Sequence, residues 1–290
     1  MAHELDLRPS ALAGQWYPGD RERLASSVDA YIGAALLPEL QGELVAVMTP
    51  HAGHRYSGPV AGYAFAAVRE AARRGFVPEL VAVVSPVHYP AYGHVLTSAH
   101  DGYNTPLGAI PLDQDAQQAL DAYLQVELGV GLTPVKRDTE HSLEIELPFL
   151  QRALKDEFRL LPVMMRDATP GTARGLGRAL AKVMGGYRSL LVASTDLSHF
   201  YRQEIACGFD EEMLRRVEAF DPLGVLQAEE EGKGFACGRG ALAAVMWAAR
   251  EMGANIARIL HYATSGDVTG DYNQVVGYGA AAFLRVEVQS

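Results

Sequence analysis

The chain has 290 residues, 49% hydrophobic and 21% charged, with a formal net charge of −10 at pH 7, a composition typical of a globular protein with a large core. An acidic chain without a lysine and arginine cluster argues against nucleic acid or anionic membranes as partners. Two cysteines, an N-terminus without a signal-peptide pattern and the lack of a long apolar run favour a cytoplasmic location.

Short apolar runs alternate with helical patterns, and no linker or repeat interrupts them. The sequence therefore predicts a single α/β domain over residues 1–290, with a central, mostly parallel or mixed sheet flanked by helices. After an irregular arm at 7–20, the expected strands are 43–48, 80–85, 158–164, 189–194, 255–262 and 275–286. The expected helices are 21–32, 59–72, 115–124, 171–184, 204–219, 222–229, one that opens within 235–240, and one capped by Thr139 that runs to 154. Pro148 could kink or break this last helix. Strands at 95–99 and 109–112 are expected to flank a hairpin or lid loop at 104–108.

Three predicted strands end in loops that carry histidine. The loop residues are His51, His88, and Asp196 with His199. Loops at the carboxyl ends of strands form the ligand crevice of open α/β sheets, so these side chains converge if the strands are neighbours. Imidazole is a common metal ligand near neutral pH, and a carboxylate can bind the metal or orient a ligand. The pattern predicts a metal site, whereas a structural hydrogen bond is the alternative for each histidine taken alone.

Cys237 is a further candidate, because it lies at a predicted helix start where backbone N–H groups stabilise a thiolate. Arg239 adds positive charge beside it, and a buried, inert cysteine is the alternative. His141 could bind a metal, move a proton or orient a ligand. First-turn capping with solvent exposure is the alternative for its neighbours Glu140 and Glu144.

Ordered sequence blocks extend along almost the whole chain. They are Arg8-Pro9, Gly14-Gln15-Trp16-Tyr17-Pro18, Pro50-His51-Ala52-Gly53, Tyr56-Ser57-Gly58, Thr105-Pro106-Leu107-Gly108, Glu140-His141-Ser142-Leu143-Glu144, Leu147-Pro148-Phe149-Leu150, Ser194-Thr195-Asp196-Leu197-Ser198-His199, Cys237-Gly238-Arg239-Gly240, Tyr262-Ala263-Thr264-Ser265-Gly266-Asp267 and Val276-Gly277-Tyr278. Together they resemble the blocks of the Memo-like family, named for a mediator of cell motility.

The resemblance implies a fold similar to the class III extradiol ring-cleaving dioxygenases, which use non-haem Fe(II). It implies His51, His88 and Cys237 as metal ligands, with Asp196 and His199 beside them. The family is linked to copper and iron binding and to recognition of partner peptides. Fe(II) is therefore the first cofactor expected, with Cu or Zn as the other metals.

Three residues depart from the patterns that the resemblance implies. His54 stands where a tyrosine is common, and Val87 stands where a small or polar residue is common. Both changes touch the expected pocket rim, where His54 could line the site. Cys237 stands where a ring-cleaving enzyme would use a carboxylate, and a thiolate favours Cu(I) or Zn and is readily oxidised.

The first functional hypothesis is a metal-binding oxidoreductase that acts on a small aromatic diol. In it, Cys237 is the third metal ligand or a redox-active thiol, and His199, oriented by Asp196, transfers a proton. The residues expected to contact the substrate are His54, Glu140, His141 and Arg239. The alternatives are a peptide- or protein-binding module that uses the same pocket without turnover, and a metal-dependent hydrolase that uses metal-bound water.

Overall fold

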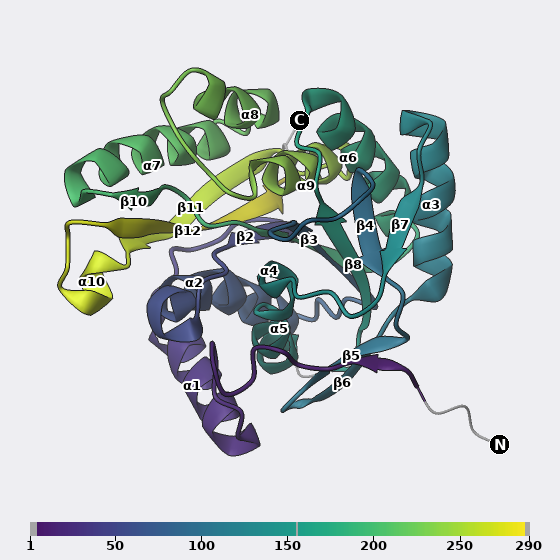
Figure 1. Ribbon diagram of the computed structural model, residues 1–290, viewed down its shortest axis with the longest axis horizontal. Helices are drawn as coiled ribbons and strands as arrows, with labels where there is room; N and C mark the ends of the chain where they lie inside the picture. The colour runs from purple at the N-terminus through teal and green to yellow at the C-terminus, as the bar shows by residue number, and fades with distance from the viewer. Residues whose placement is uncertain (1–4, 155, 288–290) are drawn as a thin grey trace.

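The computed structural model describes residues 5–154 and 156–287, which form a mixed sheet between two layers of helices (Figure 1). Helices α1 (Arg21–Ala34), α2 (His54–Arg73) and α5 (Leu147–Leu154) pack together on one face of the sheet. The other face is covered by α3 (Gln114–Leu128), α6 (Pro170–Met184), α7 (Gln203–Glu218), α8 (Pro222–Glu230) and α9 (Arg239–Glu251). Of the two short helices, α4 (His141–Glu144) lies beside α5 and contacts β3, whereas α10 (Gly266–Thr269) contacts β11 at the side of the molecule.

The main sheet has nine strands among the described residues, in the order β10-β12-β2-β9-β3-β8-β4-β7, with β11 also paired to β12. Its strands are β2 (Glu43–Thr49), β3 (Leu80–Pro86), β4 (Val95–Ser98), β7 (Leu132–Val135), β8 (Arg159–Met165), β9 (Ser189–Ser194), β10 (His199–Tyr201), β11 (Ile256–Thr264) and β12 (Val275–Arg285). The central strands β2, β9, β3 and β8 are parallel, whereas β12 pairs antiparallel with β2 and β4 pairs antiparallel with β8. The predicted α/β fold with a mixed sheet is confirmed.

The central strands are buried on both faces because their side chains alternate between two cores. On β3, Leu80, Ala82 and Val84 face the core under α6 and α9, whereas Val81 and Val83 face the core under α2 and α5. A strand covered by helices on both faces is apolar at nearly every position. The continuous apolar runs of the sequence therefore locate these strands well.

Two local predictions are wrong. The hairpin is formed by β5 (Gly102–Thr105) and β6 (Gly108–Pro111), which join β1 (Leu7–Arg8) in a separate sheet, while β4 belongs to the main sheet. The helix expected to be capped by Thr139 is capped by Glu140, and it is broken near Pro148, as the sequence allowed, into α4 and α5. Proline lacks the N–H that a continuous helix needs, so Pro148 is tolerated where it lies, in the first turn of α5.

Helix α2 begins at His54 instead of Pro59, which places the end of the β2 loop directly on a helix. The helix packs closely against α1 through Gly62: a Cβ added there would lie 2.4 Å from the carbonyl oxygen of Tyr31. No described helix has the length and apolarity needed to cross a lipid bilayer.

Replacing Gly62 with alanine should lower the free energy of unfolding by about 1–3 kcal/mol, because the new methyl group meets rigid backbone of α1. The matched control is Gly33→Ala, also in a helix, where an added Cβ meets no atom within 4 Å. That change should stabilise the protein by about 0.5–1 kcal/mol, since alanine favours the helix. Urea denaturation of both variants measures the difference, and equal effects of the two changes would contradict this account of the α1–α2 contact.

Candidate metal centre

The three histidine-bearing loops leave neighbouring strands at the same edge of the sheet. Strand β9 lies between β2 and β3, with Thr49 paired to Ser194 and Val84 paired to Ala193. His51, His88 and Asp196 each follow two residues after the end of one of these strands. The condition on which the sequence argument depended, that the strands are neighbours, is therefore met.

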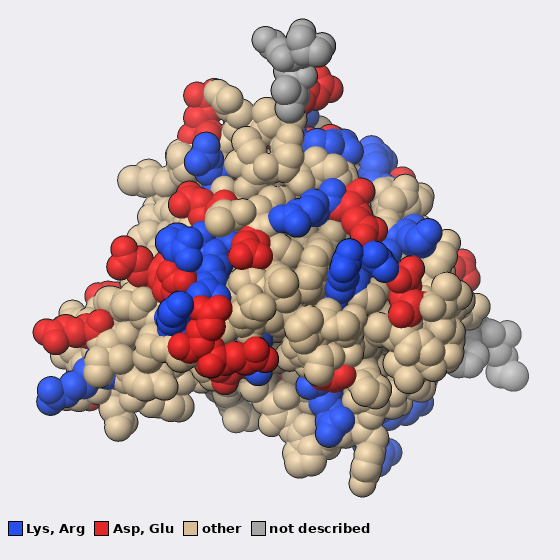
Figure 2. All heavy atoms as spheres, turned by 90° about the horizontal axis from the view of Figure 1, so that it is seen from above, with Lys and Arg blue, Asp and Glu red and all other residues tan. Residues whose placement is uncertain are grey.

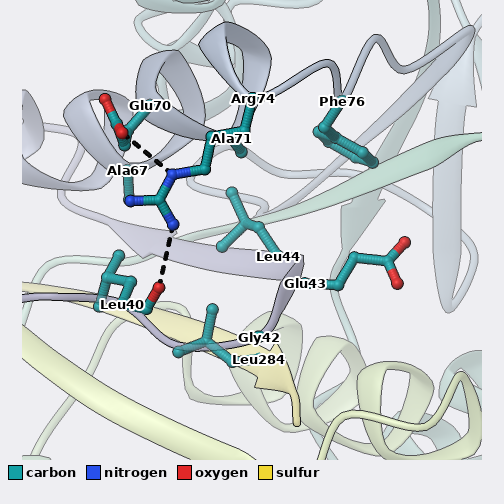
Figure 3. Close-up of a pocket in the computed structure, with 10 residues that line it drawn as sticks. All are labelled: Leu40, Gly42, Glu43, Leu44, Ala67, Glu70, Ala71, Arg74, Phe76 and Leu284. Carbon is teal, nitrogen blue, oxygen red and sulfur yellow. Dashed lines mark hydrogen bonds and ion pairs between the residues drawn. The ribbon is translucent and has the colours of Figure 1, made fainter. Parts of the chain in front are cut away.

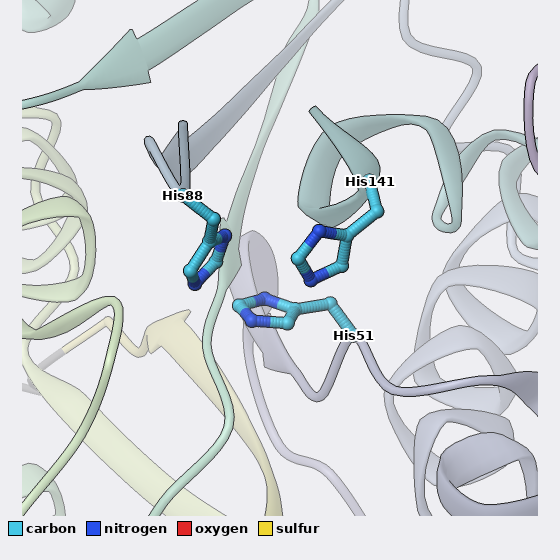
Figure 4. A group of neighbouring side chains, drawn as sticks. All are labelled: His51, His88 and His141. Atoms are coloured by element: carbon cyan, nitrogen blue, oxygen red, sulfur yellow. The ribbon is translucent and has the colours of Figure 1, made fainter. Parts of the chain in front are cut away.

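Three imidazoles form a group that could hold a metal ion. They belong to His51, His88 and His141, and one ligating nitrogen from each lies within 4.8 Å of the other two. Figure 4 shows the rings turned toward one another from the β2 loop, the β3 loop and helix α4. The His88 and His141 rings are stacked with centroids 4.5 Å apart, and the His51 ring meets both of them edge-on.

The buried carboxylate of Glu140 orients two of these rings. Its Oε2 accepts a 2.6 Å hydrogen bond from the backbone N–H of His88, and its Oε1 lies 2.9 Å from His88 Nδ1 and 3.4 Å from His141 Nδ1. Oε1 also accepts hydrogen bonds from the N–H groups of His141 and Ser142, which caps α4. Burial raises the pKa of Glu140, but the hydrogen bonds from His88 and Ser142 outweigh it and hold the pKa at about 2.

His51 is buried and is held on both sides. Its Nδ1 lies 2.9 Å from Ser194 Oγ, and its Nε2 lies 3.2 Å from the sulfur of Cys237. Burial, followed by the nearby imidazoles of His88 and His141, lowers the pKa of His51 well below its ordinary value. Burial also lowers the pKa of His141 to about 4, so both rings are neutral near pH 7 and offer a lone pair.

Cys237 lies beside the three-histidine group but is not part of it. Its sulfur accepts a 3.3 Å hydrogen bond from the backbone N–H of Asp196. Burial, followed by the charge of Asp196, raises the pKa of the Cys237 thiol, so the thiolate expected from a helix start is disfavoured without a metal. The role of Cys237 as a ligand or a redox-active thiol stays a prediction.

Asp196 and His199 lie where an acid and base could act. Asp196 Oδ1 accepts a 2.7 Å hydrogen bond from the backbone N–H of His51, and burial raises the pKa of the carboxyl to about 7. Burial lowers the pKa of His199, whose buried Nε2 has no hydrogen-bond partner among the described residues. The next residue, Phe200, has a positive φ of 63°, which is uncommon for a bulky side chain.

The three histidines of the group, together with Asp196 and His199, line one cleft of about 570 Å³, whereas Glu140, Ser194 and Cys237 lie behind it. Its histidine and acid lining is His51, His88, His141, Asp196 and His199. Its aromatic lining is Trp16, Tyr56 and Phe200, which are 37%, 39% and 68% exposed. The cleft therefore has a polar group of imidazoles and a wide aromatic rim, a combination typical of small-molecule and peptide sites.

Three residues expected to contact a substrate do not line this cleft. His54 is buried beneath it against Phe149 and hydrogen-bonds the Ile145 carbonyl, because it starts α2 and points into the core. Arg239 forms an ion pair with Glu229 on α8. Glu140 is buried behind the histidines that it orients, so it acts through them.

Other expectations for charged residues are also corrected. Glu144, expected at the surface, is buried and accepts hydrogen bonds from Arg8 Nη1 at 2.5 Å and from the Tyr17 hydroxyl at 2.7 Å. The sequence did not indicate that Arg8 pairs with Glu144, although Arg8 begins the first of the blocks that resemble the Memo-like family. The acid Glu146, which lies behind His51, was missed as well, because no local pattern marks it.

Two surface features away from the cleft differ from it. A hollow of about 250 Å³ lies at the amino end of β2, lined by Leu44, Phe76 and the ion-paired Arg74 (Figure 3). This is the sheet edge opposite the one where parallel strands present ligand loops. On the face shown in Figure 2, lysines and arginines are interspersed with acids, without a region of one sign.

Comparisons with known proteins agree with this architecture. The Memo-like protein family matches residues 8–282. A MEMO1 family protein of Methanopyrus kandleri is 36% identical over 287 residues, which cover 96% of this chain and 99% of that protein. A MEMO1 family protein of Nitrosopumilus maritimus is 32% identical, covering 96% and 100% of the two chains. The crystal structure of an uncharacterized protein from Escherichia coli K12 aligns with a TM-score of 0.51 at 15% identity, covering 82% of this chain and 99% of that one, which shows a shared fold.

The fold and the site define an α/β protein with a group of three histidines, able to hold a metal, at the carboxyl edge of its parallel strands. The chain belongs to the Memo-like family.

Glu140 should make the stability of the metal-free protein depend on pH. Because its folded pKa of about 2 is below the ordinary value of 4.5, its contribution is full above pH 4.5 and is lost as the pH falls through about 2. Glu140→Gln should therefore lower the free energy of unfolding, by on the order of 3 kcal/mol at neutral pH, with a difference that shrinks in acid. Denaturant titrations at several pH values measure it, with Glu22→Gln on the exposed side of α1 as the control. A difference that stays constant down to about pH 2 would contradict the assignment.

Proposed function

We propose that this protein is a metal-dependent oxidoreductase whose metal is held by His51 and His88 and by a third ligand at the same point. The observation that carries the proposal is the convergence of three imidazoles on a cleft with an aromatic rim. Fe(II) is the first candidate metal, because the family resemblance points to a non-haem iron fold. Cu and Zn also suit imidazole ligands.

The donor set fits a transition metal. The rings of His51 and His88 each have one nitrogen engaged by an oxygen atom, of Ser194 or Glu140. The other nitrogen could bind a metal, although that of His51, Nε2, also contacts the Cys237 sulfur at 3.2 Å. Such outer partners fix the ring orientation and the tautomer of metal-binding histidines. A bound metal would supply Lewis-acid and one-electron chemistry at the cleft.

Two residues compete for the third position. His141 has a nitrogen within 4.8 Å of the ligating nitrogens of His51 and His88. Cys237 has its sulfur 3.2 Å from His51 Nε2, so a metal that replaced the thiol proton would meet a thiolate there. We assign the position to His141 for Fe(II) and Zn(II), and expect Cys237 to matter more for the softer Cu(I).

A small aromatic diol is the substrate class that this cleft favours. Trp16, Tyr56 and Phe200 offer aromatic surfaces for a ring, and His199 lines the same cleft as a neutral base that can accept a hydroxyl proton. In extradiol cleavage both atoms of O₂ enter the ring-opened product, so no other oxidant or reductant is needed. Asp196, with its pKa at about 7, can hold or release a proton beside them.

The exposed aromatic rim also supports a second candidate, a module that binds a peptide without turnover. Trp16, Tyr56 and Phe200 are exposed large apolar side chains that line one cleft, and a patch of this kind often binds a partner. Hydrolysis by metal-bound water is the third candidate, since three histidines with an open position also form catalytic zinc sites. The measurements below separate these functions.

His51→Ala and His88→Ala should lower metal binding at least 100-fold, because each change removes one of the ligands and the metal site loses its geometry. His141→Ala should do the same for Fe(II) and Zn(II), whereas Cys237→Ala should retain both metals. Elemental analysis after anaerobic reconstitution with one metal at a time measures the stoichiometry.

His94→Ala is the control for these variants, because His94 is half-exposed and pairs with Asp167. Stoichiometric metal in His51→Ala would refute the site. Loss of Fe(II) in Cys237→Ala with full binding in His141→Ala would transfer the third position to Cys237.

His199→Ala should lower oxygen uptake with catechols by about 10²- to 10⁴-fold while leaving bound iron unchanged, because the variant lacks the base that accepts the hydroxyl proton. An oxygen electrode with the iron-loaded protein measures the rate. His261→Ala, which removes a ring stacked on Tyr63, is the matched control.

A wild type that takes up no oxygen with any catechol would refute the dioxygenase proposal. Anaerobic ester turnover would then favour the hydrolase. Peptide binding that is unchanged in His88→Ala would favour the binding module.

A further inference from the structure

The hydroxyl of Ser194 has more hydrogen-bond partners than it has protons. Ser194 is the last residue of β9 and is fully buried. Its Oγ lies 2.6 Å from the carbonyl oxygen of Ser142, 2.9 Å from Glu146 Oε1 and 2.9 Å from His51 Nδ1. One hydroxyl therefore joins helix α4, a buried acid and a candidate metal ligand.

The number of available protons fixes which partner donates in each of these hydrogen bonds. A carbonyl oxygen can only accept, so the Ser142 carbonyl takes the single hydroxyl proton, and this contact is also the shortest of the three. The Ser142 carbonyl needs this donor because α4 ends nearby. The N–H four residues on, that of Glu146, donates to the Leu143 carbonyl instead. The two lone pairs of Ser194 Oγ then remain, and two partners remain to donate to them.

Those donors are His51 Nδ1–H and a protonated Glu146. Among the described residues, the only other hydrogen bond to the Glu146 carboxyl comes from the Thr49 hydroxyl at 3.2 Å, and no lysine or arginine forms an ion pair with it. An ionised carboxylate with so few donors would be costly in this fully buried position. Burial raises the pKa of Glu146 well above its ordinary value, which agrees with the proton count.

We infer that Ser194 and Glu146 are positioning residues of the candidate metal centre, which hold His51 in the tautomer with its proton on Nδ1 and leave Nε2 for a ligand. The tautomer follows from hydrogen bonds within the protein. Its consequence for metal binding rests on the proposed function above.

The groups that accept hydrogen bonds from the two candidate ligands, His51 and His88, then differ in charge. His88 donates to the ionised carboxylate of Glu140, whereas His51 donates to a hydroxyl backed by a neutral acid. A carboxylate partner makes an imidazole more electron-rich than a hydroxyl partner does. His88 is therefore the stronger metal donor of the pair, and the neutral Glu146 adds no negative charge to the site.

The test uses the metal-free full-length protein. Long-range ¹H–¹⁵N correlation spectra distinguish a protonated ring nitrogen from an unprotonated one, and comparison with His51→Ala assigns the His51 signals. We expect the proton on Nδ1 in the wild type and a mixture of tautomers in Ser194→Ala. The infrared difference between wild type and Glu146→Gln should show the carbonyl band of a protonated carboxyl group.

Metal affinity gives a second measurement. With Zn(II) as a redox-inert probe, Ser194→Ala should weaken binding about 10- to 100-fold, as is usual when an outer partner of a metal ligand is lost. Glu146→Gln should bind nearly as the wild type does, because the amide can donate to Ser194 in place of the acid proton. Thr49→Val is the matched control, since it removes a contact of Glu146 that does not lead to His51.

A His51 proton on Nε2 in the wild type, or an infrared difference without the acid band, would overturn the inference. So would a Ser194→Ala protein with an unchanged tautomer. The wild-type spectra report the tautomer of His51 directly, so they test the inference even if Ser194→Ala does not fold. A protein that binds no metal would refute the proposed function and leave the tautomer result standing.

Discussion

The buried carboxylate of Glu140 is the interaction on which the site depends. It joins the loop after β3 to the start of α4 through the N–H groups of His88, His141 and Ser142. These donors compensate for removing a negative charge from water, and they keep the acid ionised. Because the same oxygen atoms contact His88 Nδ1, the cap of a one-turn helix also sets the orientation of a candidate metal ligand.

A second buried acid attaches the N-terminal arm to this arrangement. Glu144 accepts hydrogen bonds from Arg8, from the N–H groups of Ala11 and Leu12, and from Tyr17. A buried ion pair contributes little net stability, but losing one partner leaves a costly charge, so such pairs fix one arrangement of the chain. The arm then places Trp16 against His141, with ring centroids 4.6 Å apart, and becomes a wall of the cleft.

The sequence predicted the parts of the fold that depend on local pattern. Continuous apolar runs located β2, β3 and β9, and the residues just after them gave His51, His88 and Asp196. Glu144 was misplaced because a charge in a first helical turn usually faces solvent, while its partner Arg8 is 136 residues away. The same limit hid Glu146, which follows α4 and is buried against Ser194 of β9 and Thr49 of β2, both far away in the sequence. The edge strand β7 is only partly buried, so it lacks the apolar run that marked the central strands.

The wide spacing of the candidate ligands along the chain has a consequence for folding. Residues 51, 88 and 141 come together only after β2, β9 and β3 have paired in the correct order, so an unfolded chain has no preformed site. A ligand that binds only the native state adds about 2.7 kcal/mol of stability when its concentration is one hundred times its dissociation constant. If the candidate site holds a metal as proposed, metal supply in the surroundings would also affect how long the protein survives proteolysis.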